Sequence, residues 1–163
     1  MPTPASISQA AEDYRFNNSF VLNTVKDLSA EEWLQQPGGS SNHIAWLVGH
    51  LLWTRSRILA RLGADWSASW LDLFGRGSKV DGGAAYPSPD ALMDAWSEAG
   101  TVLSGALDSV SEETLGKPVT PPAPPTVDGK VSGLIRFLAW HETYHVGQIC
   151  YVRSLLGHKG MMG

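Results

Sequence analysis

Two histidines with the spacing of a metal-binding pair, His141 and His145, carry the clearest chemical signal in the sequence. A helix is expected over residues 131–156, and at about 100° per residue both rings fall near the centre of its apolar face, one above the other. Buried imidazoles leave ring nitrogens that need partners. One divalent cation satisfies both rings at this spacing, and two unrelated core histidines are the alternative.

A second expected helix, over residues 42–62, supplies a third candidate ligand. His50 lies on the flank of its apolar face, between Trp46 and Trp53. His43 precedes it by about 10 Å of helix rise, so one ion can take only one of the two histidines. We expect His50 to be the third ligand. His43 is expected at the bundle mouth behind the ligands, or simply facing solvent at the start of the helix.

Few other side chains qualify as helpers in catalysis. Gln148 follows the histidine pair by one turn and could orient a ring nitrogen, or hydrogen-bond to backbone instead. Tyr144 flanks the pair and could donate a proton, with packing as its alternative role. Glu142 is expected away from the chemistry, in contact with a neighbouring helix at most. Arg55 and Arg57 are expected on the solvated surface, with binding of a substrate carboxylate as the alternative. Cys150 falls on the opposite helix face and is not expected to bind the ion.

These side chains must be positioned by helices, because strand-like alternation is missing from the sequence. Polar residues at expected helix starts support this interpretation: Ser88 precedes Pro89, and Ser29 with Glu32 has the spacing of a capping box. Apolar residues at three- and four-residue steps predict four long helices, over residues 5–28, 42–62, 89–110 and 131–156.

Two long connections join the expected helices. Residues 63–87 carry several bulky aromatic side chains, which predict an ordered crossover. The proline-rich segment 118–125 is expected to be extended, as a stiff loop over the bundle mouth, with docking to an SH3-like partner as the alternative. The predicted fold is therefore all-α, a four-helix bundle with long crossover connections, in a single domain spanning residues 1–163.

Composition excludes several classes of protein. The chain has 163 residues and a formal net charge of −4, with no cluster of Lys and Arg that would indicate a nucleic-acid partner. No run reaches the ~18 apolar residues of a membrane span. The N-terminal residues lack a basic start and an apolar core, so we expect a cytoplasmic protein without membrane association. A single cysteine excludes an internal disulfide framework.

Three segments together resemble the DinB-like (DinB/YfiT-like) superfamily of bacterial metalloproteins. They are residues 41–51 (SNHIAWLVGHL), 138–149 (LAWHETYHVGQI) and 153–157 (RSLLG). The resemblance extends over nearly the whole chain. It implies a four-helix bundle that binds Zn²⁺ or Ni²⁺ through three histidines, which correspond here to His50, His141 and His145. Homodimers are common in this superfamily, so a homodimer is also expected.

Relatives in the superfamily include thiol transferases that use bacillithiol, mycothiol or glutathione, and a mycothiol-dependent isomerase. The resemblance thus implies a small-molecule substrate, together with a low-molecular-weight thiol. Three histidines leave an open coordination position, which is typical of catalytic metal sites. We therefore predict a metal-dependent enzyme, a thiol transferase or a hydrolase. The alternatives are a non-catalytic metal-binding bundle with a structural or stress-related role, and a helical interaction module without metal.

Overall fold

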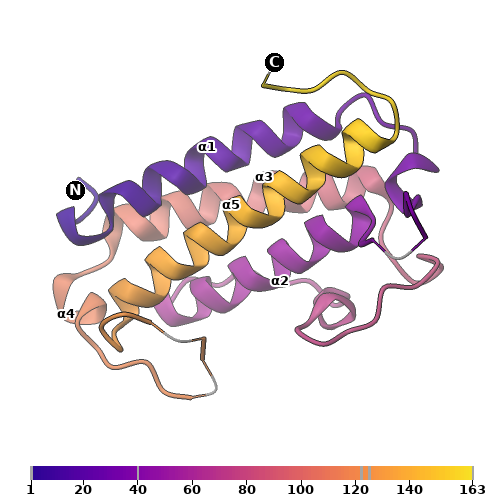
Figure 1. Cartoon of the computed structure of the whole chain (residues 1–163). Helices are drawn as coiled ribbons and strands as arrows, with labels where there is room; N and C mark the ends of the chain where they lie inside the picture. Colours follow the sequence, from indigo (N-terminus) through magenta and orange to yellow (C-terminus); the bar gives the residue numbers. More distant parts are fainter. Residues whose placement is uncertain (1, 40, 122, 125, 163) are drawn as a thin grey trace.

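The computed structural model describes residues 2–39, 41–121, 123–124 and 126–162 (Figure 1). The described residues form helices joined by turns and loops, with one isolated β-bridge between Pro118 and Lys130. None of the helices in this part of the chain combines the length and apolar character needed to cross a bilayer. The α-helices are α1 (Ser8–Val25), α2 (Ile44–Leu62), α3 (Pro89–Ser109), α4 (Glu112–Leu115) and α5 (Val131–Leu155).

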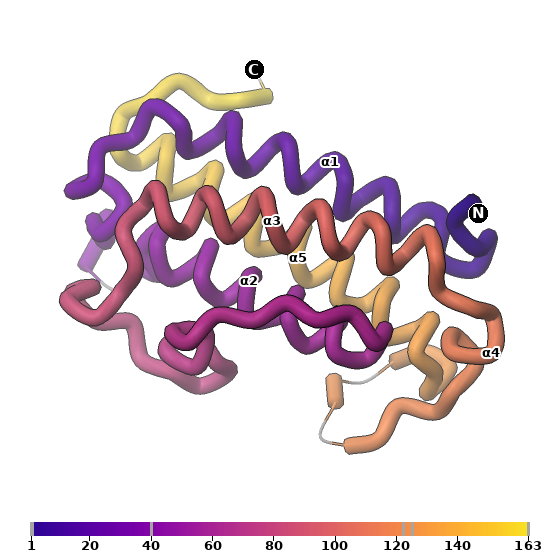
Figure 2. The backbone as a smooth tube through the Cα atoms, turned by 180° about the vertical axis from the view of Figure 1, so that it is seen from behind, coloured from indigo at the N-terminus to yellow at the C-terminus, as the bar shows by residue number. Residues whose placement is uncertain are grey.

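The four long helices pack side by side as a bundle in which α1 and α2 each contact both α3 and α5. Helices α1 and α5 run in one direction, and α2 and α3 run in the opposite direction (Figures 1 and 2). Because α2 and α3 are parallel neighbours, the chain must return along the bundle between them. The all-α bundle with a long crossover connection that the sequence predicts is thereby confirmed.

The crossover between α2 and α3 is ordered by its aromatic residues, as expected. A short 3₁₀ helix, Leu71–Phe74, packs against α2, and the Phe74 side chain is fully buried. Trp66, Trp70 and Tyr86 are partly buried and pack against the same core. The crossover therefore covers α2, the helix that carries His50, and can supply backbone groups to the site.

The other connection is closed at its base by backbone hydrogen bonds. The N–H of Val119 donates to the carbonyl of Gly129 at 2.9 Å, and the N–H of Val131 donates to the carbonyl of Lys117 at 3.0 Å. Two of the prolines in the predicted proline-rich loop, at positions 122 and 125, lie outside the described residues. Docking of this loop to a partner stays a prediction.

Helix ends follow the capping signals of the sequence. The N–H of Ser29 donates to the Glu32 carboxylate at 2.8 Å, and the N–H of Glu32 donates to Oγ of Ser29 at 3.3 Å, which is the predicted capping box. Oγ of Ser88 accepts from the N–H of Ala91 at the start of α3. Gly63 ends α2 with a positive φ of 73°, a conformation that favours glycine.

We expect Ser88→Ala to lower the free energy of unfolding by about 1 kcal/mol, because the N–H of Ala91 in the first turn of α3 loses its hydrogen bond to the Ser88 hydroxyl. Urea unfolding followed by circular dichroism measures this change. Ser97→Ala is the matched control, since Ser97 is exposed in the interior of the same helix. An equal loss in both variants would show that the cap contributes nothing.

Candidate metal centre

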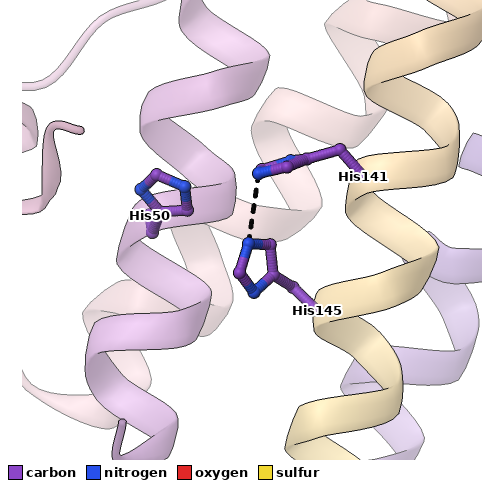
Figure 3. A group of neighbouring side chains, drawn as sticks. All are labelled: His50, His141 and His145. Atoms are coloured by element: carbon purple, nitrogen blue, oxygen red, sulfur yellow. Dashed lines mark hydrogen bonds between the residues drawn. The ribbon is translucent and has the colours of Figure 1, made fainter. Parts of the chain in front are cut away.

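Three histidines from two helices converge at one point of the bundle (Figure 3). His50 comes from α2, and His141 and His145 come from α5. One ring nitrogen from each lies within 4.8 Å of the others. No fourth histidine, cysteine or carboxylate joins this group among the residues that the structure describes. The arrangement therefore offers three nitrogen donors to one ion, from the three residues that the sequence predicts.

The histidine pair lies at the edge of the buried face of α5 rather than at the centre of that face. The buried face of α5 follows Ala139, Glu142 and Val146, while the rings of His141 and His145 are only partly buried. The predicted placement at the centre of the apolar face is thus wrong by about one residue step around the helix. The pattern misled because Phe137 and Leu138, apolar residues of the same stripe, are only partly buried. This position leaves the site accessible from solvent.

His50 is held by the crossover and by two tryptophans. Its Nδ1 donates a hydrogen bond to the carbonyl oxygen of Phe74 at 2.8 Å, which leaves Nε2 as the unprotonated nitrogen of the neutral ring. The ring stacks between Trp46, at 4.8 Å, and Trp53, at 5.8 Å. The predicted position between these tryptophans is confirmed. Burial lowers the pKa of His50 below its usual value, so the ring is neutral at pH 7.

His145 is oriented by Gln148, one turn further along α5. Nδ1 of His145 lies 2.6 Å from Oε1 of Gln148, and an amide oxygen can only accept. The hydrogen of the neutral ring is therefore on Nδ1, and Nε2 is free to bind an ion. Burial lowers the pKa of His145, although this hydrogen bond partly offsets the effect. The orienting contact expected for Gln148 is present in the structure.

His141 completes the group from one turn earlier on α5. Its Nε2 lies 3.1 Å from Nε2 of His145 and donates the hydrogen bond between them, because Nε2 of His145 is the acceptor (Figure 3). Nδ1 of His141 is buried without a hydrogen-bond partner. Burial, together with the neighbouring rings of His145 and His50, lowers the pKa of His141 to about 4.

The residues present fit a transition-metal cation. Two nitrogens bound to one Zn²⁺ at about 2.0–2.1 Å in a tetrahedral arrangement lie ~3.3 Å apart, and the Nε2 atoms of His141 and His145 are 3.1 Å apart. All three rings have lowered pKa values, so each is neutral at pH 7 and has one unprotonated nitrogen for an ion. His141 would bind through Nε2 in the tautomer that carries its hydrogen on Nδ1. Imidazole nitrogens suit zinc, nickel, copper and iron alike, whereas Mg²⁺ and Ca²⁺ prefer oxygen ligands.

The packing of Phe74 on α2 explains why the residue before His50 is a glycine, Gly49. A Cβ at this position would lie 2.4 Å from the ring of Phe74, so only glycine lets that ring pack directly on α2. The same close packing brings the Phe74 carbonyl to Nδ1 of His50. The Gly49-His50 pair is therefore one structural unit with Phe74.

We expect Gly49→Ala to destabilise the fold by about 1–3 kcal/mol through overpacking. It should also weaken Zn²⁺ binding by about 10- to 100-fold, because the carbonyl that orients His50 moves with Phe74. Thermal unfolding and competition with a chromophoric chelator measure the two effects. Gly105→Ala in α3 is the matched control, since its new Cβ would meet no atom within 4 Å. It should leave binding unchanged and slightly stabilise the helix.

His43 does not face solvent, which was one of its two predicted positions. It is fully buried, and its Nδ1 accepts a hydrogen bond from the N–H of Trp46 as the N-cap of α2. Its Nε2 lies 2.9 Å from the carbonyl oxygen of Asp81 and donates to it, which ties the crossover to the start of the helix. The solvent-facing alternative is wrong, because both ring nitrogens are hydrogen-bonded, one to the first turn of α2 and one to the crossover. The position at the bundle mouth stays a prediction.

Arg55 differs from expectation, whereas Glu142 makes the contact with a neighbouring helix that the sequence allows. Arg55 is fully buried rather than solvated, and its guanidinium pairs with the buried carboxylate of Glu142. One signal was available in the sequence: Arg55 lies four residues after Leu51 and three before Ile58, on the apolar face of α2. Tyr144 is largely exposed, and its ring meets that of His145 edge-on at 5.3 Å, so its position beside the pair is as expected.

Comparison with known proteins identifies the family. Comparison with curated proteins finds no match for this chain. The family model of the DinB superfamily matches residues 18–149, a segment that contains all three histidines of the cluster. The match extends over most of the chain, and it agrees with the all-helical fold. The protein is thus a member of the DinB superfamily.

Proposed function

We propose that this protein is a divalent-metal-dependent enzyme that acts on a small molecule, with thiol transfer as the first candidate reaction and hydrolysis as the second. The observation that carries the proposal is the convergence of three neutral imidazoles within 4.8 Å at the accessible edge of the bundle. Among the ions that imidazole suits, zinc and nickel are proposed because the resemblance to DinB-like metalloproteins implies them. His50, His141 and His145 would hold the ion.

An open coordination position supports catalysis over a structural role. Structural zinc is normally enclosed by four protein ligands, whereas catalytic zinc keeps a place for substrate. Here the described residues supply three. When bound, the cation would lower the pKa of a water or thiol that it holds and so supply a nucleophile at neutral pH.

The chain itself orients the ligands and shapes their surroundings. The Phe74 carbonyl and the Gln148 amide oxygen fix the hydrogens of His50 and His145 on Nδ1, which aims both Nε2 atoms at the same point. Trp46 stacks on His50 and excludes water from that side. We assign Tyr144 the role of proton donor at the rim, because its exposed ring lies beside His145.

Thiol transfer comes first because DinB-like relatives include enzymes that use low-molecular-weight thiols. A thiolate is also a soft ligand that suits zinc and nickel. The proposal places the reaction in the bacterial cytoplasm, where such thiols stay reduced. A homodimer, the other partner expected from the resemblance, is proposed on that basis alone and is tested by sedimentation.

Elemental analysis of the purified protein followed by a turnover screen tests the proposal. We expect about one zinc or nickel ion per chain, and metal-dependent turnover of glutathione, mycothiol or bacillithiol with a chromogenic electrophile, or of a chromogenic ester. The chelated protein and His50→Ala serve as inactive controls. Bound metal without any turnover would favour the non-catalytic metal-binding bundle. A protein that takes up no metal would overturn the proposal.

A further inference from the structure

A buried ion pair links the two helices that carry the histidines. Nε of Arg55 on α2 donates to Oε2 of Glu142 on α5 at 2.8 Å, and Nη2 of Arg55 donates to Oε1 at 3.0 Å. The two side chains are 0% and 1% exposed. The contact is thus a bidentate ion pair with fixed geometry, buried away from solvent.

The remaining contacts of Arg55 reach the other two long helices. Nη1 donates to Oδ1 of Asn18 on α1 at 2.9 Å and to the backbone carbonyl of Trp96 on α3 at 3.4 Å. The guanidinium carbon also lies 3.6 Å from the centre of the Trp96 ring. Indole Nε1 of Trp96 donates to the carbonyl of Asn18, which joins α1 and α3 around the same point. All four long helices therefore meet at this one side chain.

The ion pair lies close to the metal centre without belonging to it. Arg55 follows His50 by five residues, or ~7.5 Å of helix rise, on α2. Glu142 adjoins His141 and precedes His145 by ~4.5 Å of rise on α5. A slide of α2 along α5 by one residue, ~1.5 Å, would move the guanidinium out of line with the carboxylate and so lengthen and bend both hydrogen bonds of the pair. The same slide would carry His50 away from the other two rings.

We propose that Arg55 and Glu142 are positioning residues that fix the axial register of α2 against α5 and thereby hold His50 opposite His141 and His145. This inference rests on the proposed metal centre. Packed apolar side chains tolerate small shifts and lose a unique arrangement before they lose stability. A guanidinium that donates two parallel hydrogen bonds to one carboxylate requires one relative position of the two side chains. The pair therefore sets the register of the helices, which leucine contacts leave free. Neither residue touches the ring nitrogens that would bind the ion.

The double variant Arg55→Met/Glu142→Leu tests this role, because it replaces the pair with apolar residues of similar size. We expect its Zn²⁺ affinity to fall by about 10- to 100-fold, as for other residues that orient metal ligands. The visible spectrum of the Co²⁺-loaded protein should change in band position and intensity. The matched control is Arg153→Met/Asp27→Leu, which removes the ion pair that joins α5 to the end of α1 and involves no residue of α2. It should keep the wild-type affinity and spectrum.

Wild-type affinity and an unchanged Co²⁺ spectrum in the double variant would overturn the proposal. Arg55→Lys provides a second test should the double variant not fold, because it keeps the charge but loses the two parallel hydrogen bonds to Glu142. A Zn²⁺ affinity of Arg55→Lys equal to that of the wild type also contradicts the proposed role.

A metal-free measurement separates this inference from the proposed function. The ring of His50 lies 5.4 Å from that of His141 and 5.2 Å from that of His145, centre to centre. Nuclear Overhauser contacts between these ring protons should appear in the metal-free wild type and disappear in the double variant. If the wild type binds no metal, the proposed function fails, but loss of these contacts still supports the register role. Their persistence in the double variant refutes it.

Discussion

Alanine in place of His50 is expected to lower the affinity for Zn²⁺ by more than about 100-fold while the bundle stays folded. His50 is the sole candidate ligand from α2 in the described cluster, so its loss leaves two donors on one helix. Residues that only orient metal ligands contribute 10- to 100-fold in affinity, and removal of a ligand should cost more. The fold should survive because the apolar residues of α2 that form the core stay in place.

Competition with a chromophoric chelator measures the affinity, and circular dichroism checks the fold. His43→Asn is the matched control, because His43 is another buried histidine of the same helical segment and asparagine can still cap α2. It should bind Zn²⁺ as the wild type does. Equal affinities of the His50→Ala and wild-type proteins would show that residue 50 is not a ligand.

The parts of the site that sequence predicts are those fixed by helix periodicity. A separation of four residues places His141 and His145 on one face of any helix, whatever it packs against. His50 required more, because its meeting with α5 depends on how the two helices are aligned. The position of His50 about half way along its expected helix and the resemblance to the DinB-like superfamily supplied that information. The bundle followed from four long periodic segments and a crossover rich in aromatic residues.

The parts that sequence did not predict depend on partners far along the chain. His43 is buried because its ring nitrogens meet a backbone N–H three residues later and a carbonyl in the crossover. The Phe74 carbonyl that orients His50 belongs to the backbone and leaves no side-chain signal. Arg55 is buried because a carboxylate 87 positions away compensates its charge. The helical period places Arg55 on the apolar face of α2, but a lone guanidinium favours solvent, and only the tertiary pairing reverses that preference.

Replacement of Glu142 alone by leucine is expected to lower the free energy of unfolding by about 3–5 kcal/mol, because it leaves the guanidinium of Arg55 buried without its countercharge. This is a large share of the 5–15 kcal/mol that stabilises a typical domain. Arg55→Met should cost a similar amount for the same reason. Urea unfolding of the metal-free proteins measures both, so that metal binding does not contribute.

The double variant Arg55→Met/Glu142→Leu should recover most of this loss, since apolar residues that replace a buried ion pair are often neutral or stabilising. The control pair behaves differently. Asp27 is about half exposed, so Asp27→Asn should cost at most ~1 kcal/mol. A double variant as unstable as the sum of its single variants would show that the pair contributes net stability. Recovered stability together with weakened metal binding would instead show that the charges are retained for the alignment of α2 with α5.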